Sequence, residues 1–307
     1  MFETVALAKA VLVAAVMMRL VAWGAPRPWR RDSCWSWAIG AGVLAASGAT
    51  DQWPHWPAFE DRARFLTLLV PLTLGIETLA AILPSRGLAW VARVSLAIVT
   101  APILLHNSVY LAQLNGRDSA EWSLAEATVV LGGLAALLAI VWTLLSSLER
   151  RTSTRSVQGV LILDALATAV TVMLSGYYGA GLLGLGLAGA IAGATLAASA
   201  APPSSSARGS LGMSVIGIFA VVIMGRFFGT LSTGLAACLL LAPLVAWTIE
   251  LPWLRKLGSA WRAAGRLACV AIPLLVVLIV AQRKFTAASV GRSRAFEPSA
   301  TADRVEK

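Results

Sequence analysis

Apolar stretches of about 20 residues recur along almost the whole of this chain, and short polar breaks separate them. A membrane-spanning helix needs roughly 20 mostly apolar residues, because the hydrocarbon layer is about 30 Å thick. The sequence therefore predicts an all-α, polytopic transmembrane helical bundle of about ten spans, within a range of about nine to eleven. We expect these helices near residues 4–23, 35–50, 64–83, 87–108, 123–147, 157–176, 179–200, 210–227, 230–249 and 264–282.

Composition supports the same fold class. Of the 307 residues, 58% are hydrophobic and 13% are charged, whereas soluble domains average about 45–50% apolar and about 25% charged residues. A water-soluble fold could not hide that much apolar surface. We expect one transmembrane domain over residues 1–282, followed by a flexible, polar and basic tail over residues 283–307. The whole chain is expected to reside in the cell membrane.

The stretch 211–249 decides the span count, because its only polar break is Gly225-Arg226. A single helix over this stretch would be about 58 Å long at 1.5 Å per residue, almost twice the thickness of the hydrocarbon layer. We therefore expect the chain to fold back here, either as two spans or as a re-entrant pair.

Loop charges predict the orientation, since cytoplasmic loops are enriched in Lys and Arg. One alternating set of loops and helix ends carries twelve basic residues: Arg27, Arg30, Arg31, Arg86, Arg150, Arg151, Arg155, Arg208, Arg255, Lys256, Arg262 and Arg266. The opposite set carries Arg62, Arg64, Arg117 and Arg226 together with five acids, Asp51, Glu60, Asp61, Asp118 and Glu121. The amino terminus is then outside. Ten spans also put the basic tail outside, which conflicts with its charge and leaves its side open.

The formal net charge of +10 belongs to these loops rather than to a solvent-facing stripe. Such cations contact anionic lipid headgroups, so the lipid bilayer is the expected partner and nucleic acid is not. A small solute and other membrane subunits are the further partners that the sequence leaves open.

One pair of segments hints at an internal repeat. Residues 38–49 match residues 190–201 at about seven of twelve positions, and they occupy the second helices of two five-helix halves, 1–150 and 151–282. An odd number of spans per half would make the halves inverted repeats, a plan common among secondary transporters. This outline is similar to that of the drug/metabolite transporter superfamily. No residue motif carries a functional position over from that family.

Ionisable side chains inside a span are expensive, so they are the first candidates for a functional site. The deepest acids are Glu77, between Pro71 and Pro84, and Asp164 in the sixth predicted helix. If both faced a common cavity, they could exchange protons as a proton-coupled carrier requires. The alternative is that each pairs with a neighbouring cation or hydroxyl and locks helices together. The available cations are Lys9, Arg19 and Arg93, and all three lie near helix ends, where they can reach the headgroups.

His106 and Asn107 close the fourth predicted helix just after Pro102, and polar groups beside a kink often line a cavity. With two histidines in the chain, no HExxH pattern and no serine in a GxSxG context, the sequence indicates no metal site, no cofactor and no catalytic residue. Gly184, Gly189 and Gly193 are expected to serve close helix packing. Tyr177-Tyr178 before them is interpreted as an interfacial anchor.

Three functions remain open. A small-solute secondary transporter, proton-coupled through the buried acids, is the leading hypothesis. A non-catalytic membrane subunit or assembly protein is the second, and it would use the charged tail and the glycine-rich helix to contact other chains. A membrane-embedded enzyme acting on lipids is the third, although enzymatic activity is not the expectation. It would rest on Arg117, Asp118 and Glu121 beside His106.

Overall fold

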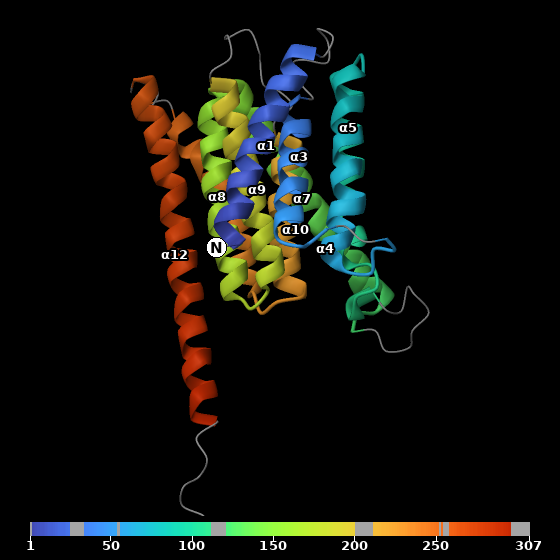
Figure 1. Ribbon diagram of the computed structural model, residues 1–307, viewed down its shortest axis with the longest axis vertical. Coiled ribbons are helices and arrows are strands. Elements are labelled where there is room, and N and C mark those ends of the chain that lie inside the picture. The colour runs from blue at the N-terminus through green and yellow to red at the C-terminus, as the bar shows by residue number, and fades with distance from the viewer. Residues whose placement is uncertain are drawn as a thin grey trace, which may run out of the picture.

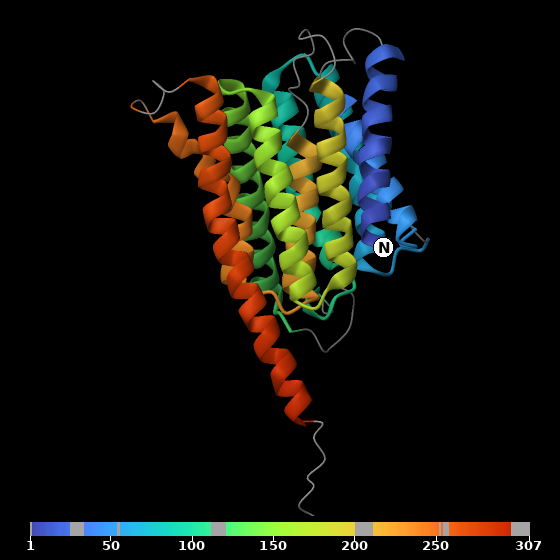
Figure 2. The same cartoon turned by 60° about the vertical axis from the view of Figure 1, so that its left-hand side comes forward.

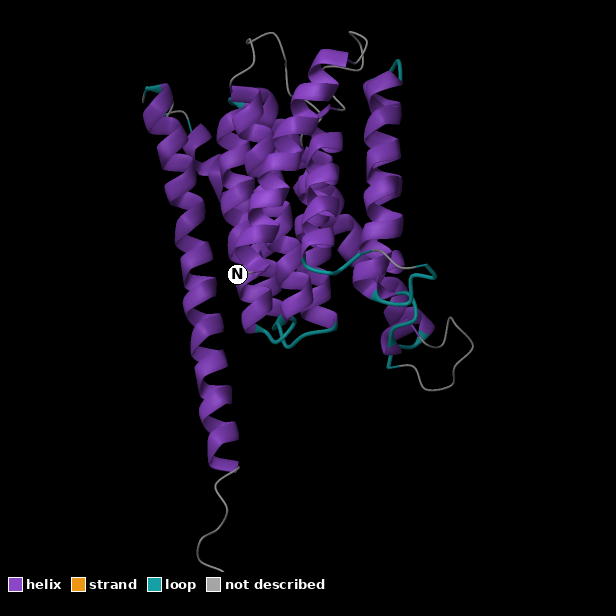
Figure 3. Cartoon of the chain, viewed as in Figure 1, coloured by secondary structure: helices purple, strands orange, loops and turns teal. Residues whose placement is uncertain are grey.

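The computed structural model describes residues 2–24, 34–53, 56–111, 121–199, 211–251, 253 and 258–295, and this part of the chain is helical, without a strand (Figure 3). The helices are α1 Phe2–Gly24, α3 Cys34–Ala49, α4 Asp61–Arg64, η1 Phe65–Leu69, α5 Val70–Ile82, α6 Arg86–Leu105, α7 Leu124–Arg151, α8 Thr154–Leu174, α9 Tyr178–Ser199, α10 Leu211–Phe227, α11 Thr233–Leu241, η3 Ala242–Glu250 and α12 Ser259–Ala295. The long helices run side by side and form a bundle (Figure 1).

Within the described ranges, eight helical segments are long and apolar enough to cross a membrane, and two shorter apolar helices, α3 and α10, stand among them. The fold is thus the predicted polytopic helical bundle. The stretch 211–249 folds back at residues 228–232, with α10 before the turn and α11 and η3 after it. One of the eight segments runs through α4, η1 and α5 as a single unit, Asp61–Ile82.

The π-helical turn η1 follows from Pro71. Proline has no backbone N–H, and its ring collides with the carbonyl four residues earlier, so a regular α-helical turn cannot form across Thr67. The wider π-helical turn at Phe65–Leu69 lies just before this proline. π-Helical turns are rare and occur mostly as single-turn bulges of this kind inside α-helices.

The last helix is longer than predicted. We expected a span over 264–282, whereas α12 begins at Ser259 and runs for 37 residues to Ala295, about 55 Å at 1.5 Å per residue. Its end projects well beyond the other helices (Figures 1 and 2). Of the predicted tail 283–307, residues 283–295 continue this helix, and residues 296–307 lie outside the described part.

The two ends of the bundle differ in charge. The end at which α6, α8 and α12 begin is called the basic end; of the predicted loop cations, those in the described part are Arg86, Arg150, Arg151, Arg155, Arg262 and Arg266. The other six predicted loop cations, Arg27, Arg30, Arg31, Arg208, Arg255 and Lys256, lie outside the described residues. The opposite end, called the acidic end, carries Asp51, Glu60, Asp61 and Glu121, and the N-terminus and the end of α12 lie on this side (Figure 1).

The centre of the bundle is α10, which is buried from Leu211 to Gly225. Beside it, α9 packs closely against α1 and α8 through small residues. A side chain at Gly193 would meet the Val11 backbone, and one at Gly189 would lie 3.0 Å from Leu7 Cδ1. Gly184 faces Ala169 of α8 in the same way, at 2.9 Å from its Cβ. The glycines thus lie where backbones approach most closely, as small residues do between membrane helices.

Segment 38–49 of the suspected repeat lies in α3, and residues 190–199 of the other segment lie in α9, which packs against α3. Residues 200 and 201 lie outside the described part. A Cβ at Gly42 would lie 2.6 Å from the Ala190 Cβ, and one at Gly186 would lie 2.6 Å from the Ala46 Cβ. Both segments therefore need small side chains at the same interface, which by itself accounts for much of their similarity. The inverted duplication stays a prediction.

Replacing Gly193 by alanine is expected to destabilise the bundle by about 1–3 kcal/mol, because the new methyl group would push α9 away from the α1 backbone. Gly132→Ala in α7 is the matched control: nothing lies within 4 Å of a Cβ at this position. Alanine should be neutral or slightly favourable there. Thermal unfolding of the two variants in detergent measures the difference, and equal melting temperatures would contradict the packing role of Gly193.

Candidate functional site

An ion pair joins the helical hairpin of α5 and α6. Glu77 lies five residues before the end of α5, and Arg93 lies seven residues after the start of α6. Arg93 donates from Nε to Glu77 Oε1 at 2.8 Å and from Nη2 to Oε2 at 2.7 Å. This two-point arrangement is the strongest geometry between a guanidinium and a carboxylate. The structure therefore brings two of the predicted site residues together as partners.

The partners differ in burial. The Glu77 side chain is 1% exposed, whereas that of Arg93 is 28% exposed. Glu77 also rests against α10, where a Cβ at Gly212 would lie only 2.5 Å from Oε1. The carboxylate is thus enclosed between helices, and the guanidinium forms the boundary between it and the space outside.

That space is a pocket of about 730 Å³ at the basic end, between α5, α6 and α7. Arg93 lines it, and its guanidinium lies 5.9 Å from the ring centroid of Trp142, within cation–π range. Trp90, one turn before Arg93 on α6, also lines the pocket and donates from Nε1 to the Thr143 hydroxyl of α7 at 3.4 Å. Arg86 and Arg150 lie at the mouth of the pocket, near the ends of their helices.

Asp164 does not share this pocket. It lies in α8, is 0% exposed, and lines a separate cavity of about 20 Å³ whose other walls are apolar side chains of α7, α8, α10, α11 and η3. Its carboxylate oxygens have no hydrogen-bond partner among the described residues. The hydroxyls of Thr168 and Thr171, on the same face of α8, also lack one there. Glu77 and Asp164 therefore do not form one site.

His106 and Asn107 lie at the acidic end, where α6 ends, and both are exposed. Asn107 has a φ of 59°, a left-handed conformation that asparagine tolerates better than most residues. Thirteen residues of helix separate His106 from Arg93, which is about 20 Å. The candidate residues His106 and Asn107 are therefore far from Arg93 along the same helix, and the structure does not bring them into one site. Arg117 and Asp118 lie outside the described residues, so the cluster proposed for a lipid enzyme is described only at Glu121 and His106.

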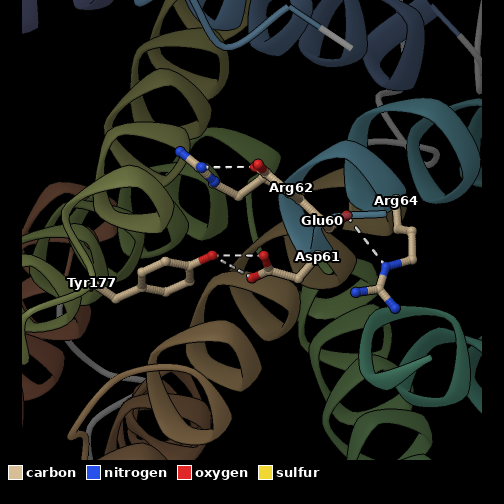
Figure 4. Close-up of polar contacts among 5 residues, drawn as sticks. All are labelled: Glu60, Asp61, Arg62, Arg64 and Tyr177. Atoms are coloured by element: carbon tan, nitrogen blue, oxygen red, sulfur yellow. Dashed lines mark hydrogen bonds and ion pairs between the residues drawn. The ribbon is translucent and has the colours of Figure 1, made fainter. Parts of the chain in front are cut away.

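A second polar cluster closes the acidic end, and the sequence did not reveal it (Figure 4). The Tyr177 hydroxyl reaches both carboxylate oxygens of Asp61, at 2.6 and 2.7 Å. Arg62 pairs with Glu60 at 2.8 Å, and Arg64 donates from Nε to the Glu60 carbonyl oxygen at 3.3 Å. The start of α4 is thus fastened to the turn between α8 and α9.

Burial and the hydrogen bond to Asp61 raise the pKa of the Tyr177 hydroxyl. The interpretation of Tyr177 as a mere interfacial anchor was incomplete.

A third contact lies at the basic end. Arg266 of α12 donates to the carboxylate of Glu250 at the end of η3, and to the Ser156 hydroxyl of α8 at 3.0 Å. Arg266 is 4% exposed and Glu250 is 8% exposed. Arg266 had been counted among the loop cations, but its place seven residues inside α12 buries it. The sequence indicated this contact only through an acid at the end of one apolar segment and a cation inside the next.

The described residues hold no group of three or more His, Cys, Asp or Glu side chains that could bind a metal ion. Comparison with protein-family models, with curated proteins and with solved structures gives no match for this chain. The outline similarity to drug/metabolite transporters therefore remains an expectation from span count alone.

Removing one partner of the Glu77–Arg93 pair should destabilise the protein unequally. Arg93→Gln leaves an acid enclosed without its counter-charge, which costs about 3–5 kcal/mol. Glu77→Gln leaves the partly exposed Arg93 able to turn towards the pocket, so its cost should be smaller. The double variant should be more stable than Arg93→Gln alone. Thermal unfolding of all four proteins tests this order, and additive losses would show that the two side chains do not interact.

The Tyr177 hydroxyl should make stability depend on alkaline pH. Its pKa in the folded protein lies above the ordinary value near 10. The unfolded chain therefore releases this proton first, and stability falls as the pH rises above about 10. Tyr177→Phe should flatten this decline between about pH 9 and 11. Tyr110→Phe, which keeps an aromatic ring in place and removes the hydroxyl of another tyrosine at the same end of the bundle, is the control. Parallel declines of wild type and Tyr177→Phe would refute the assignment.

Proposed function

We propose that this chain is a small-solute secondary transporter whose substrate site is the pocket between α5, α6 and α7. The observation that carries this proposal is the arrangement at the pocket's inner end, where a cation reaches the open space and an enclosed acid neutralises it. Ionisable pairs in a cavity within the span are typical of solute and ion pathways. A volume of about 730 Å³ suits a small organic molecule.

We further propose that the basic end faces the cytoplasm of a cell membrane. Its loops carry the cations that favour this side and contact anionic headgroups there. The pocket then opens inwards. Both termini of the described chain lie on the outer side, so the exposed Arg283 and Lys284 on α12 are also outside.

The acidic end supports an inward-open arrangement because it is closed in two places. One is the Asp61–Tyr177 contact. The other is a cluster of Tyr110, Trp122 and Phe227, whose ring centroids lie 4.8 to 5.5 Å apart. Alternating access requires such contacts to open when the pocket closes. Each joins residues that lie at or beside the ends of different helices, so movement of those helices would break them.

A non-catalytic membrane subunit is the second candidate, and one observation favours it. The end of α12 projects beyond the bundle with exposed side chains on every face from Gln282 to Ser289. A partner protein on the outer side could bind to this segment. Truncation after Gln282 separates the two functions: it should abolish a partner's binding and leave solute transport intact.

Cysteine accessibility tests the transport proposal without a known substrate. Ser146→Cys, in a background without Cys34, Cys238 and Cys269, places one thiol in the pocket. A membrane-impermeant maleimide should label it from the cytoplasmic side and, in a smaller fraction, from outside. Tyr177→Phe should raise the outside fraction by weakening the outer closure. Ser289→Cys, on the projecting helix, should be labelled only from outside.

Labelling of Ser146→Cys from one side alone, unchanged by Tyr177→Phe, would refute alternating access. The subunit hypothesis would then take its place. Cytoplasmic labelling of Ser289→Cys would instead show that the proposed orientation is wrong.

A further inference from the structure

We infer that this pocket binds an organic anion with an apolar or aromatic portion, and that the anionic group displaces Glu77 from Arg93. The inference rests on the pocket named in the proposed function and adds the chemical class of its ligand. It does not require that the ligand be transported.

Charge is the first argument. Arg86, Arg93 and Arg150 line the pocket, and Glu149 is the single acid among the described lining residues. Glu149 is 8% exposed, whereas Arg86 and Arg150 are exposed. The accessible lining is thus positive. Guanidinium groups bind carboxylate, phosphate and sulfonate groups through parallel hydrogen bonds, which favours an anionic ligand over a cationic one.

The apolar walls supply the second argument. Trp90 and Trp142 line the pocket together with Leu83, Val94 and Ala139. A ligand that is only an anion, such as inorganic phosphate, would leave these walls in contact with water. Indole rings contribute large apolar contact areas at a low cost in conformational entropy. A ring or short alkyl chain attached to the anionic group would cover them.

The geometry of the ion pair supplies the third argument. Among the described residues, Arg93 is the only group that donates hydrogen bonds to the Glu77 carboxylate. Its guanidinium lines the pocket, whereas Glu77 is enclosed behind it. An anion that enters must compete for the same donors. When it takes Arg93, Glu77 is left between α5 and α10 without a counter-charge and takes up one proton. The exchange balances: ligand anion plus proton enter, Arg93 stays charged, and Glu77 becomes neutral.

No other described group is placed to neutralise Glu77. Its neighbours α10, α3, α6 and η1 carry few ionisable side chains: Arg226 at the far end of α10, Cys34 at the start of α3, and Arg86 and Arg93 on α6. The segment η1 has none, and Asp61, Arg62 and Arg64 lie about 20 Å away at the other end of the α4–α5 segment. The exchange therefore depends on Arg93.

Two sources offer this chemistry, a free organic anion from the cytoplasm and the headgroup of an anionic lipid. Three probes separate them: phenyl phosphate for the free anion, short-chain dihexanoyl phosphatidylglycerol for the lipid, and inorganic phosphate for an anion without an apolar part. Isothermal titration calorimetry of the full-length protein in a neutral detergent gives the dissociation constants. Titrations in two buffers with different ionisation enthalpies give the number of protons taken up.

We expect phenyl phosphate or dihexanoyl phosphatidylglycerol to bind at least about tenfold more tightly than inorganic phosphate, because only these fill the apolar walls. About one proton should enter with each anion. Glu77→Gln should bind at least as tightly as wild type but without proton uptake. Arg93→Gln should weaken binding about 30-fold or more, the usual loss on truncating a buried charged contact.

The Glu77→Gln/Arg93→Gln double variant guards against misfolding, since it removes both charges together. It should bind as weakly as Arg93→Gln. Arg283→Gln, which removes one charge from the exposed end of α12, should bind like wild type. Binding of phenyl phosphate alone assigns the site to a free anion, and binding of the phosphatidylglycerol alone assigns it to a lipid.

Three results would overturn the inference. The first is that neither phenyl phosphate nor dihexanoyl phosphatidylglycerol binds. The second is that both variants carrying Arg93→Gln bind the probes as tightly as the wild type. The third is that the wild type binds a probe without taking up a proton. The last would refute the exchange with Glu77 in particular. Alternating cysteine labelling without anion binding would refute only the ligand class. Anion binding without alternating labelling would show a binding site that is not a carrier.

Discussion

Inside a hydrocarbon layer an ionised side chain is tolerated only where another group or water compensates it. Glu77 and Arg93 meet this condition by pairing with each other, and the pair fixes how α5 stands against α6. Because Glu77 also rests on α10 at Gly212, the hairpin is held to the central helix at the same point. The pocket opens on the remaining side of Arg93. The position of the pocket thus depends on where the bundle encloses the Glu77–Arg93 pair.

The number and order of the helices could be predicted from the sequence, because apolar length and loop charge are local properties. The turn within 211–249 was expected from one polar break, Gly225-Arg226, and the structure places it just after, at residues 228–232. The end of α12 could not be predicted in this way. Hydropathy falls after residue 282, but a helix needs no apolar residues once it has left the membrane, and nothing at Arg283 or Lys284 stops it.

The candidate site was harder to predict, because it depends on how helices are rotated against one another. Glu77 was recognisable as a buried acid, and pairing with a neighbouring cation was one of the two alternatives considered. Arg93 was expected instead to reach the headgroups from a place near its helix end, and it turns out to be the partner of Glu77. Whether Asp164 joined them depended on which helices pack against α8 and on which of its faces Asp164 lies, and no local pattern reveals either. The contact between Asp61 and Tyr177 joins residues 116 positions apart, and Arg266 and Glu250 each look like an ordinary residue at a helix end. These pairings are properties of the assembled bundle.

The projecting end of α12 has a consequence for biogenesis. In the proposed orientation, Arg283 and Lys284 must cross the bilayer while the chain is inserted. The membrane potential opposes this at about 2.3 kcal/mol per charge for each 100 mV. The apolar stretch before them offsets that work, since insertion of each Leu, Ile or Val near the centre of a span is favourable by about 0.3–0.6 kcal/mol. Residues 270–280 contain nine such side chains. In that orientation, the length and hydrophobicity of this helix serve to carry these charges across the bilayer as well as to pack against its neighbours.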